Sequence, residues 1–195
     1  FHGHSAAFRM SVTQYSVEDL RREALAIYRA ALGQVEGRNC AAQALHSSPF
    51  SGPVHLVAIG KAAAAMTLGA SEVLGNALTS ALVITKQGHG APDFHGDSRI
   101  SQLEAEHPVP GAGSLTAGRR LLSFLAEAPG DAQVLFLISG GASSLVEVLA
   151  RSVSLADYQR VNQWLLGSGW DIHRMNRVRI QLSCIKGGRL VRHLQ

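Results

Sequence analysis

Short apolar runs that alternate with helical segments constrain the fold of this chain more than any other feature. The helical patterns between the runs cover 62–74 and 118–126. Strands that alternate with helices are typical of βαβ units and a mostly parallel sheet. Nearly continuous apolar strands agree, because such a sheet is covered on both faces. The sequence therefore predicts an α/β fold, a Rossmann-like layered sandwich. The four runs cover Val54–Ile59, 81–85, 99–104 and Gln133–Ile138.

Helices are expected on both sides of this alternating region. Apolar residues recur at helical spacing from Ser16 to Gly37, and Asp19 follows Ser16 at the capping-box distance. A second short helix is predicted over 40–45, and a third over 154–166 with Ser154 as its N-cap and Trp164 on its apolar face. We expect an N-terminal helix pair within residues 15–50 and an α/β domain over 51–195. Residues 1–14 are expected to be vector-derived or disordered.

Composition excludes several classes of protein. Hydrophobic residues make up 46% of the chain, which excludes wholesale disorder, and the apolar runs are too short to span a membrane. The formal net charge of +4 is scattered, so nucleic-acid binding has little support. Two cysteines are too few for a disulfide framework. Nothing in the sequence indicates export, so we expect a cytoplasmic protein.

Polar and glycine-rich loops follow all four apolar runs. In an open parallel sheet, ligands bind beyond the carboxyl ends of the strands. The residues that follow the runs should therefore gather at one rim of the sheet. They include Gly60 and Lys61, then Lys86 and His89, then His107, and finally the segment 139–143.

Lysine is rare in this chain, and its positions are informative. Lys61, Lys86 and Lys186 are the only lysines among 18 basic residues, and each lies beside or close to a glycine. A compact ammonium next to exposed backbone suits a phosphate or carboxylate oxygen. The alternative is that all three are ordinary surface lysines.

The segment after the fourth run reads Ser139, Gly140, Gly141, Ala142, Ser143. Glycines let the backbone approach a ligand closely, and N–H groups at the start of the following helix attract anions. The alternative is a tight turn without a ligand. The chain contains neither a P-loop motif nor the GxGxxG pattern of dinucleotide-binding proteins.

Further candidates lie in the loops and near the C-terminus. His89 and His107 occupy glycine- or proline-rich loops and are the histidines best placed to act, although both could be structural. Asn176, Arg179 and Lys186 form a polar cluster near the C-terminus, which could also be a solvated helix end. No set of metal ligands can be assigned.

Taken together, these loops resemble the glycerate 2-kinase family, also called hydroxypyruvate-reductase-like glycerate kinases. Each matching stretch is weakly specific alone, but they occur in the order of the family from about residue 54 onward. The matching stretches are VAIGKAAAAM, VITKQGHG, EAEHPVPGAGS, LFLISGGASSL, SLADYQRVNQWLLGSG and MNRVRIQLSCIKGGRL.

The resemblance implies a kinase that transfers the γ-phosphoryl group of ATP to D-glycerate, gives 2-phosphoglycerate and requires Mg²⁺. It implies two α/β domains with the active site between them, of which the C-terminal domain, with its metal-binding segment, is absent from this chain. Lys61 matches the active-site lysine of the family, and 139–143 matches a glycine-rich SGGGS loop. Asn176, Arg179 and Lys186 fall in a stretch that lines the cleft.

Two departures from the family pattern bear on the site. Ala142 replaces a third glycine of the SGGGS loop, and Gly111 replaces an acid that follows HPVP. Two other functions therefore stay open: a non-catalytic α/β module that binds an anionic metabolite or a nucleotide, and a sugar-phosphate-binding regulatory domain. The oligomeric state also stays open, with a homodimer as one alternative.

Overall fold

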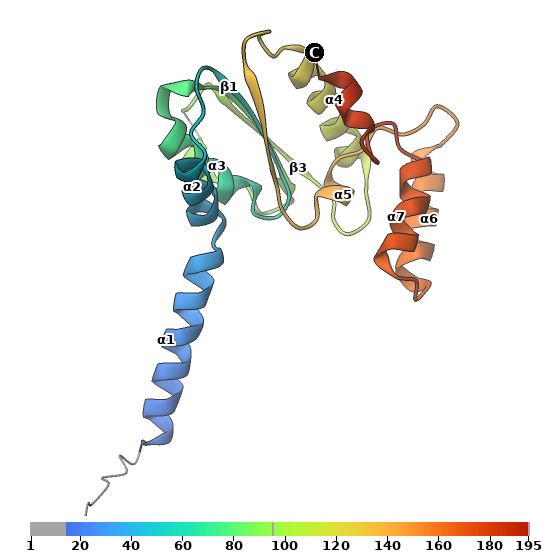
Figure 1. Ribbon diagram of the computed structural model, residues 1–195. Helices are drawn as coiled ribbons and strands as arrows, with labels where there is room; N and C mark the ends of the chain where they lie inside the picture. The colour runs from blue at the N-terminus through green and yellow to red at the C-terminus, as the bar shows by residue number, and fades with distance from the viewer. Residues whose placement is uncertain (1–14, 95, 195) are drawn as a thin grey trace, which may run out of the picture. The chain divides into compact units, whose positions relative to one another are not determined.

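The computed structural model describes residues 15–94 and 96–194, and the chain divides into two compact units, residues 1–35 and 36–195 (Figure 1). The described part of the first unit is dominated by helix α1, Val17–Val35. The Asp19 backbone N–H donates to Ser16 Oγ at 3.1 Å and the Ser16 N–H donates to Asp19 Oδ2 at 3.2 Å, so the predicted capping box is confirmed. The expectation for residues 1–14 lies outside the described residues.

A parallel sheet of four strands forms the centre of the second unit, which confirms the predicted fold class. The strand order is β3-β2-β1-β4, so the chain builds the sheet outward from β1 in one direction and then adds β4 on the other side of β1. That order makes the β1–β4 boundary a topological switch point. The strands are β1 Val54–Ile59, β2 Leu78–Lys86, β3 Ile100–Ala105 and β4 Gln133–Ile138.

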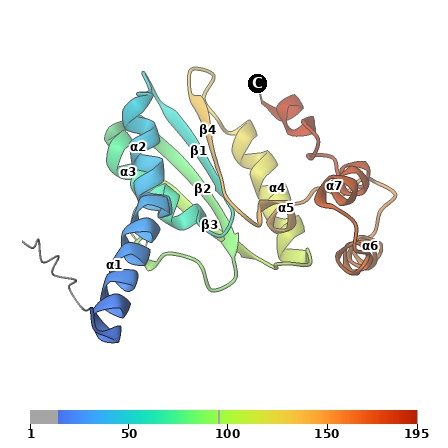
Figure 2. The same cartoon turned by 60° about the horizontal axis from the view of Figure 1, so that its bottom comes forward.

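Helices cover both faces of this sheet (Figure 2). Helices α2, Gly37–Ser47, and α3, Ala63–Leu74, lie on one face, and α4, Ala112–Ala126, lies on the other. Successive strand residues point to opposite faces, so Val57 packs in the cluster that contains Leu121 of α4, whereas Ala58 packs in the cluster that contains Ala63 of α3. Both faces of β1 are therefore buried, as its continuous apolar sequence predicts.

The second helix of the expected N-terminal pair belongs to the α/β unit. A Cβ atom on Gly69 of α3 would lie only 2.0 Å from the Arg38 carbonyl oxygen of α2. Glycine at position 69 therefore allows the two helices to pack closely, and Leu45 of α2 joins the core beside the sheet. Helix α1, in contrast, belongs to the other compact unit.

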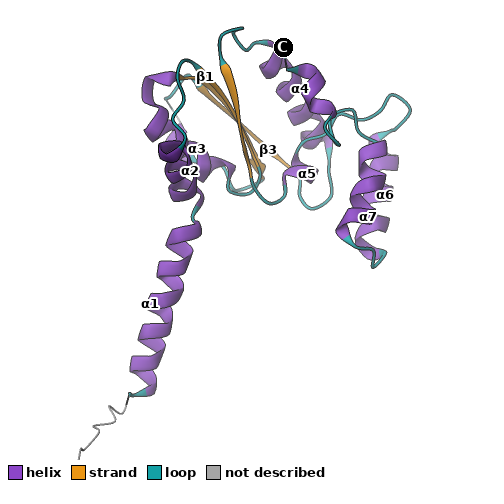
Figure 3. Cartoon of the chain, viewed as in Figure 1, coloured by secondary structure: helices purple, strands orange, loops and turns teal. Residues whose placement is uncertain are grey.

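The C-terminal part of the chain is helical (Figure 3). The Asp157 N–H donates to Ser154 Oγ at 3.1 Å, so the predicted N-cap of α6 is confirmed. The placement of Trp164 on the buried face is wrong: Tyr158 and Leu165 define that face, and Trp164 is 57% exposed. The elements are α5 Ala142–Leu145, α6 Leu155–Gly167 and α7 Ile172–Gln181, with short 3-10 helices at Gly75–Ala77, Pro92–Phe94 and Arg189–His193.

Within the described residues, no helix combines the length and the apolar character needed to cross a bilayer.

Candidate functional site

The loops that leave β1 and β4 interlock at the switch point. The Lys61 N–H donates to the Gly140 carbonyl at 2.9 Å, and the Ala62 N–H donates to Ser139 Oγ at 3.0 Å. Gly60 has a φ of +130°, and a Cβ atom there would lie 2.2 Å from Ser139 Oγ. Only glycine allows this approach, so the backbone of the two loops is fixed around the base of Lys61.

His107 reaches the same place from the loop after β3. A Cβ atom on Gly141, whose φ is +93°, would lie 3.0 Å from His107 Nε2 and 3.5 Å from Lys61 Cε. Residues that lie 80 positions apart in the sequence therefore meet around one glycine. This is the convergence at the carboxyl rim of the sheet that the sequence predicts.

The loop after β2 brings further positive charge. Lys86 is the last residue of β2, and the Glu104 carboxylate holds the following turn by accepting from the Gly88 and Gly90 N–H groups at 3.0 Å each. Burial lowers the pKa of His107, and the charges of Lys61, Lys86 and His89 lower it further. The rim is therefore electropositive, and it favours a neutral imidazole at His107.

The backbone of the glycine-rich turn is regular at Ala142, the position where alanine departs from the SGGGS loop. Ala142 begins α5, and positive φ angles among the described residues occur only at glycines, so alanine is not strained there. Helix α5 has four residues. A single turn adds little dipole, so the backbone approach at Gly141 matters more here than the helix dipole that the sequence interpretation invoked.

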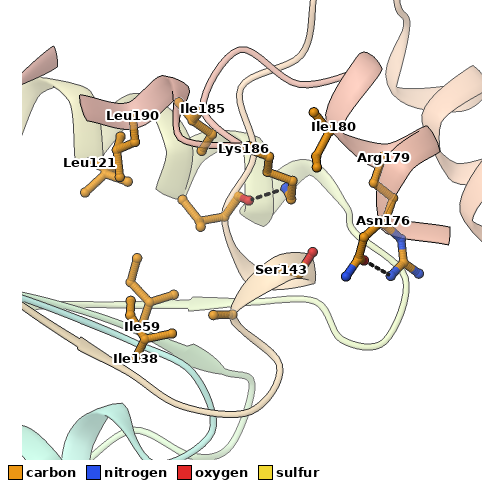
Figure 4. Close-up of a pocket in the computed structure, with 13 residues that line it drawn as sticks. Ile59, Leu121, Ile138, Ser143, Asn176, Arg179, Ile180, Ile185, Lys186 and Leu190 are labelled. Carbon is orange, nitrogen blue, oxygen red and sulfur yellow. Dashed lines mark hydrogen bonds between the residues drawn. The ribbon is translucent and has the colours of Figure 1, made fainter. Parts of the chain in front are cut away.

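Arg179 lies between two cavities next to this turn. The first, of about 310 Å³, has mostly apolar walls and includes Ser143, Asn176 and Arg179 (Figure 4). The second, of about 190 Å³, is lined by His107, Gly141, Ser143 and Arg179. Arg179 Nε donates to Asn162 Oδ1 at 3.0 Å and Nη1 donates to Asn176 Oδ1 at 3.3 Å. These bonds fix the guanidinium at the boundary between the cavities.

Lys186 lines the first cavity, but its ammonium is engaged elsewhere. It donates to the fully buried Glu147 carboxylate and, at 3.2 Å, to the Val146 carbonyl. The Tyr158 hydroxyl donates to the same carboxylate. The sequence interpretation offered Lys186 as a ligand-binding cation and missed Glu147 and Tyr158. The one signal for Glu147 was an acid enclosed by apolar residues.

Glu106 has a structural role that sequence reasoning also missed. Its carboxylate accepts from the Gly113 and Ser114 N–H groups at 3.2 Å each, at the N-terminus of α4. A Cβ atom on Gly111 would lie 2.4 Å from Glu106 Cδ. Glu106 therefore places a negative charge at the N-terminus of α4, and glycine at position 111 leaves room for it.

The described residues of this rim form no set of magnesium ligands. Mg²⁺ prefers carboxylate oxygens, and the nearby carboxylates of Glu104 and Glu106 are occupied by backbone N–H groups. No group of three or more acidic, histidine or cysteine side chains that could hold a metal occurs in the described part of the chain. The described residues do not fit a magnesium site, and we assign none.

Comparison with known proteins shows close similarity to glycerate kinases. The D-glycerate 2-kinase of Thermotoga maritima is 43% identical over 136 residues, which are 70% of this chain and 32% of that protein. A protein of Agrobacterium vitis, provisionally named a hydroxypyruvate reductase, is 43% identical over 135 residues, 69% of this chain and 34% of that protein. This chain thus spans about a third of the length of these curated relatives.

A solved structure agrees with the sequence comparison. The crystal structure of a Thermotoga maritima glycerate kinase superposes with a TM-score of 0.80 and 36% identity, and the match covers 91% of this chain and 42% of that one. The model of one family, described as Domain of unknown function (DUF4147), matches residues 23–195. The chain therefore belongs to the DUF4147 family.

Proposed function

We propose that this chain forms part of a kinase that transfers the γ-phosphoryl group of ATP to D-glycerate and gives 2-phosphoglycerate. The observation that carries the proposal is the meeting of Lys61 and His107 with the glycine-rich turn at the β1–β4 switch point, where the charge of Lys86 also acts on His107. The resemblance to glycerate 2-kinases, and the name of the Thermotoga maritima relative, supply the reaction.

The chemistry of phosphoryl transfer suits this arrangement. The reaction requires little covalent work from the protein, and it depends on positioning and on stabilising charge at the phosphoryl oxygens. In the proposal, Lys61 and Lys86 neutralise the phosphates of ATP, and the turn at 139–143 lets its backbone approach them. Lys61 is the catalytic residue, because its backbone N–H donates to the Gly140 carbonyl and its side chain adjoins Gly141 of the turn.

Glycerate belongs in the smaller cavity of the proposed site. D-Glycerate has three carbons and one carboxylate, and the cavity of about 190 Å³ offers the Arg179 guanidinium and the Ser143 hydroxyl. The cavity of about 310 Å³, with apolar walls such as Ile180 and Leu190, is better suited to the nucleotide. Asn176 then has a supporting role through its bond to Arg179.

The remaining elements of the proposal follow the reaction. ATP and D-glycerate are the small-molecule partners, a cytoplasmic location would supply both, and a homodimer is compatible with the site as described. No step of the mechanism is assigned to Mg²⁺. A reductase is the alternative function, given the provisional name of one relative. The kinase is favoured because the chain has no GxGxxG pattern.

The test is the release of ADP that depends on D-glycerate, measured on the whole protein in which these residues occur. We expect ADP release with ATP and D-glycerate together, and ³¹P NMR of the product should show a phosphate on the 2-hydroxyl. The parallel assay follows NADH oxidation with hydroxypyruvate. Hydroxypyruvate-dependent NADH oxidation without ADP release would show that the protein is a reductase and that the kinase proposal is wrong.

A further inference from the structure

The imidazole of His107 occupies an unusual place among the groups at the rim. It lies beside the glycine-rich turn, lines the cavity of about 190 Å³ and is half-buried, whereas His89 at the same rim is exposed. Its Nε2 atom faces Gly141, the residue next to the Lys61 side chain. A reacting group that enters this cavity would therefore meet His107 together with Gly141 and Ser143 of the glycine-rich turn.

The charged groups that face His107 come from every element around it. Lys61 follows β1, Lys86 ends β2 and His89 lies in the next loop, and all three disfavour a positive charge on the imidazole. Arg179 of α7 lines the same cavity. The acid beside His107 in the sequence, Glu106, is turned toward the N-terminus of α4 and accepts backbone N–H groups there.

Cationic surroundings have a chemical consequence for His107. A neutral imidazole retains a lone pair that can accept a proton, whereas an imidazolium cannot. The surroundings also explain why the group would release that proton readily after accepting it, since a second positive charge near Lys61 and Lys86 is unfavourable. His107 thus combines access to the cavity with the protonation state of a base.

We propose that His107 is the general base for the attacking hydroxyl of D-glycerate, an inference that rests on the kinase function proposed above. The imidazole accepts the proton of the 2-hydroxyl while that oxygen forms a bond to the γ-phosphorus of ATP. The bond from the γ-phosphorus to the bridging oxygen breaks, and ADP leaves with the electron pair. The imidazolium then gives the proton to solvent, so that the proton and the charges balance.

Steady-state kinetics of His107→Asn in the whole protein test this role. Asparagine keeps a polar side chain but cannot act as a base, so kcat should fall about 100-fold or more, while KM for ATP and for D-glycerate changes less than about threefold. The matched control is His46→Asn, an exposed histidine near the end of α2, which should keep the wild-type kcat. The acidic limb of the wild-type pH profile should disappear in His107→Asn.

A kcat within threefold of wild type, or an unchanged acidic limb, would overturn the inference and leave the kinase proposal intact. The absence of D-glycerate-dependent ADP release from the wild-type protein would overturn both. These outcomes are distinguishable because wild type, His46→Asn and His107→Asn are assayed together.

A titration of the 195-residue chain by NMR gives a readout that does not depend on turnover. The imidazole signals of His107, assigned by their loss in His107→Asn, should report a pKa below the ordinary value of 6.5. In Lys61→Met that pKa should move upward, because one of the charges that lower it has been removed. An upward shift of the wild-type pKa above 6.5, or no response to Lys61→Met, would contradict the proposed surroundings of the base.

Discussion

Lys61 and Lys186 each lie next to a glycine, yet the fold gives the two lysines opposite surroundings. Lys61 is exposed at the rim of the sheet, where its side chain adjoins Gly141 and His107. The Lys186 side chain is only 15% exposed, and its ammonium pairs with Glu147, which is completely buried. The exposed ammonium of Lys61 can therefore reach a ligand, whereas the ammonium of Lys186 is already paired within the protein.

The two lysines differ because Lys186 has a buried acidic partner, Glu147, and not because of the lysine itself or the glycine beside it. Glu147 precedes Lys186 by 39 residues, and the pair links the segment after α5 to the segment after α7. The Cys184 N–H donates to the Val148 carbonyl at 2.7 Å and joins the same two segments. Lys186 therefore ties the segment after α7, the helix of Arg179, to the segment after α5, whereas Lys61 is exposed at the rim.

Lys186→Met should produce the largest loss of stability. The change leaves the Glu147 carboxylate buried without its cation, and breaking a buried pair in this way costs about 3–5 kcal/mol. Urea unfolding followed by circular dichroism should show a loss of this size. Combining Lys186→Met with Glu147→Leu removes both charges and should recover much of it. A loss below about 1 kcal/mol in the single variant would contradict the structural role.

The sheet could be predicted from the sequence because each strand has a local signal. Val54–Ile59 and Gln133–Ile138 were predicted with the bounds that the structure has. The start of α4 at position 112 was missed by six residues. Its first turn begins with the small residues Ala, Gly and Ser, which carry little helical signal, and the Glu106 carboxylate stabilises it from outside the helix. A contact between separate segments leaves no periodic pattern in either one.

The same reasoning separates the predictable and unpredictable parts of the site. Parallel strands bring their carboxyl ends to one rim, so the meeting of Lys61, His107 and 139–143 follows from the order of the elements. The burial of Lys186 does not, because it depends on Glu147 and Tyr158 reaching one point from separate segments. The Asn162–Arg179 bond, between α6 and α7, was missed for the same reason.

Gly60→Ala is expected to have the next largest effect, and it tests the rim. A Cβ atom at position 60 would meet Ser139 Oγ at 2.2 Å and the Ser139 carbonyl oxygen at 2.6 Å, on a backbone with φ of +130°. We expect a loss of about 2–4 kcal/mol in the free energy of unfolding from strain and overpacking. Gly140→Ala is the matched control: a Cβ there meets nothing within 4 Å, and the change should be nearly neutral. Equal losses in the two variants would show that the loops do not interlock.

Lys61→Met should weaken ligand binding and leave the fold intact. The side chain is exposed at the rim, so the free energy of unfolding should change by less than about 0.5 kcal/mol. The dissociation constant for ATP, measured by calorimetry, should rise about 10- to 100-fold, which corresponds to about 1.4–2.7 kcal/mol. Arg160→Met removes one positive charge from the outer surface of α6, where the side chain is 79% exposed, and should leave ATP binding unchanged. A similar loss of affinity in both variants would mean that Lys61 acts only through the net charge of the protein and not through its position at the rim.

The smallest expected effect is a change in the pH dependence of stability. It arises at Tyr158, which donates to the same buried carboxylate as Lys186. Burial, and then the negative charge and the hydrogen bond of Glu147, raise the pKa of Tyr158 far above its ordinary value of 10.0. A raised folded-state pKa means that the stabilisation is complete below pH 10 and is lost as pH rises above it, because the unfolded chain ionises first. The pKa of Lys186 is lowered, so its contribution to stability rises with pH up to its ordinary value of 10.5. This contribution is present in both wild type and Tyr158→Phe, so the comparison of the two proteins isolates the effect of Tyr158. The difference in unfolding free energy between wild type and Tyr158→Phe should therefore shrink above pH 10, by at most about 1.4 kcal/mol per pH unit. A constant difference between pH 8 and pH 11, measured by urea unfolding, would mean that the Tyr158 hydroxyl does not share the buried carboxylate with Lys186.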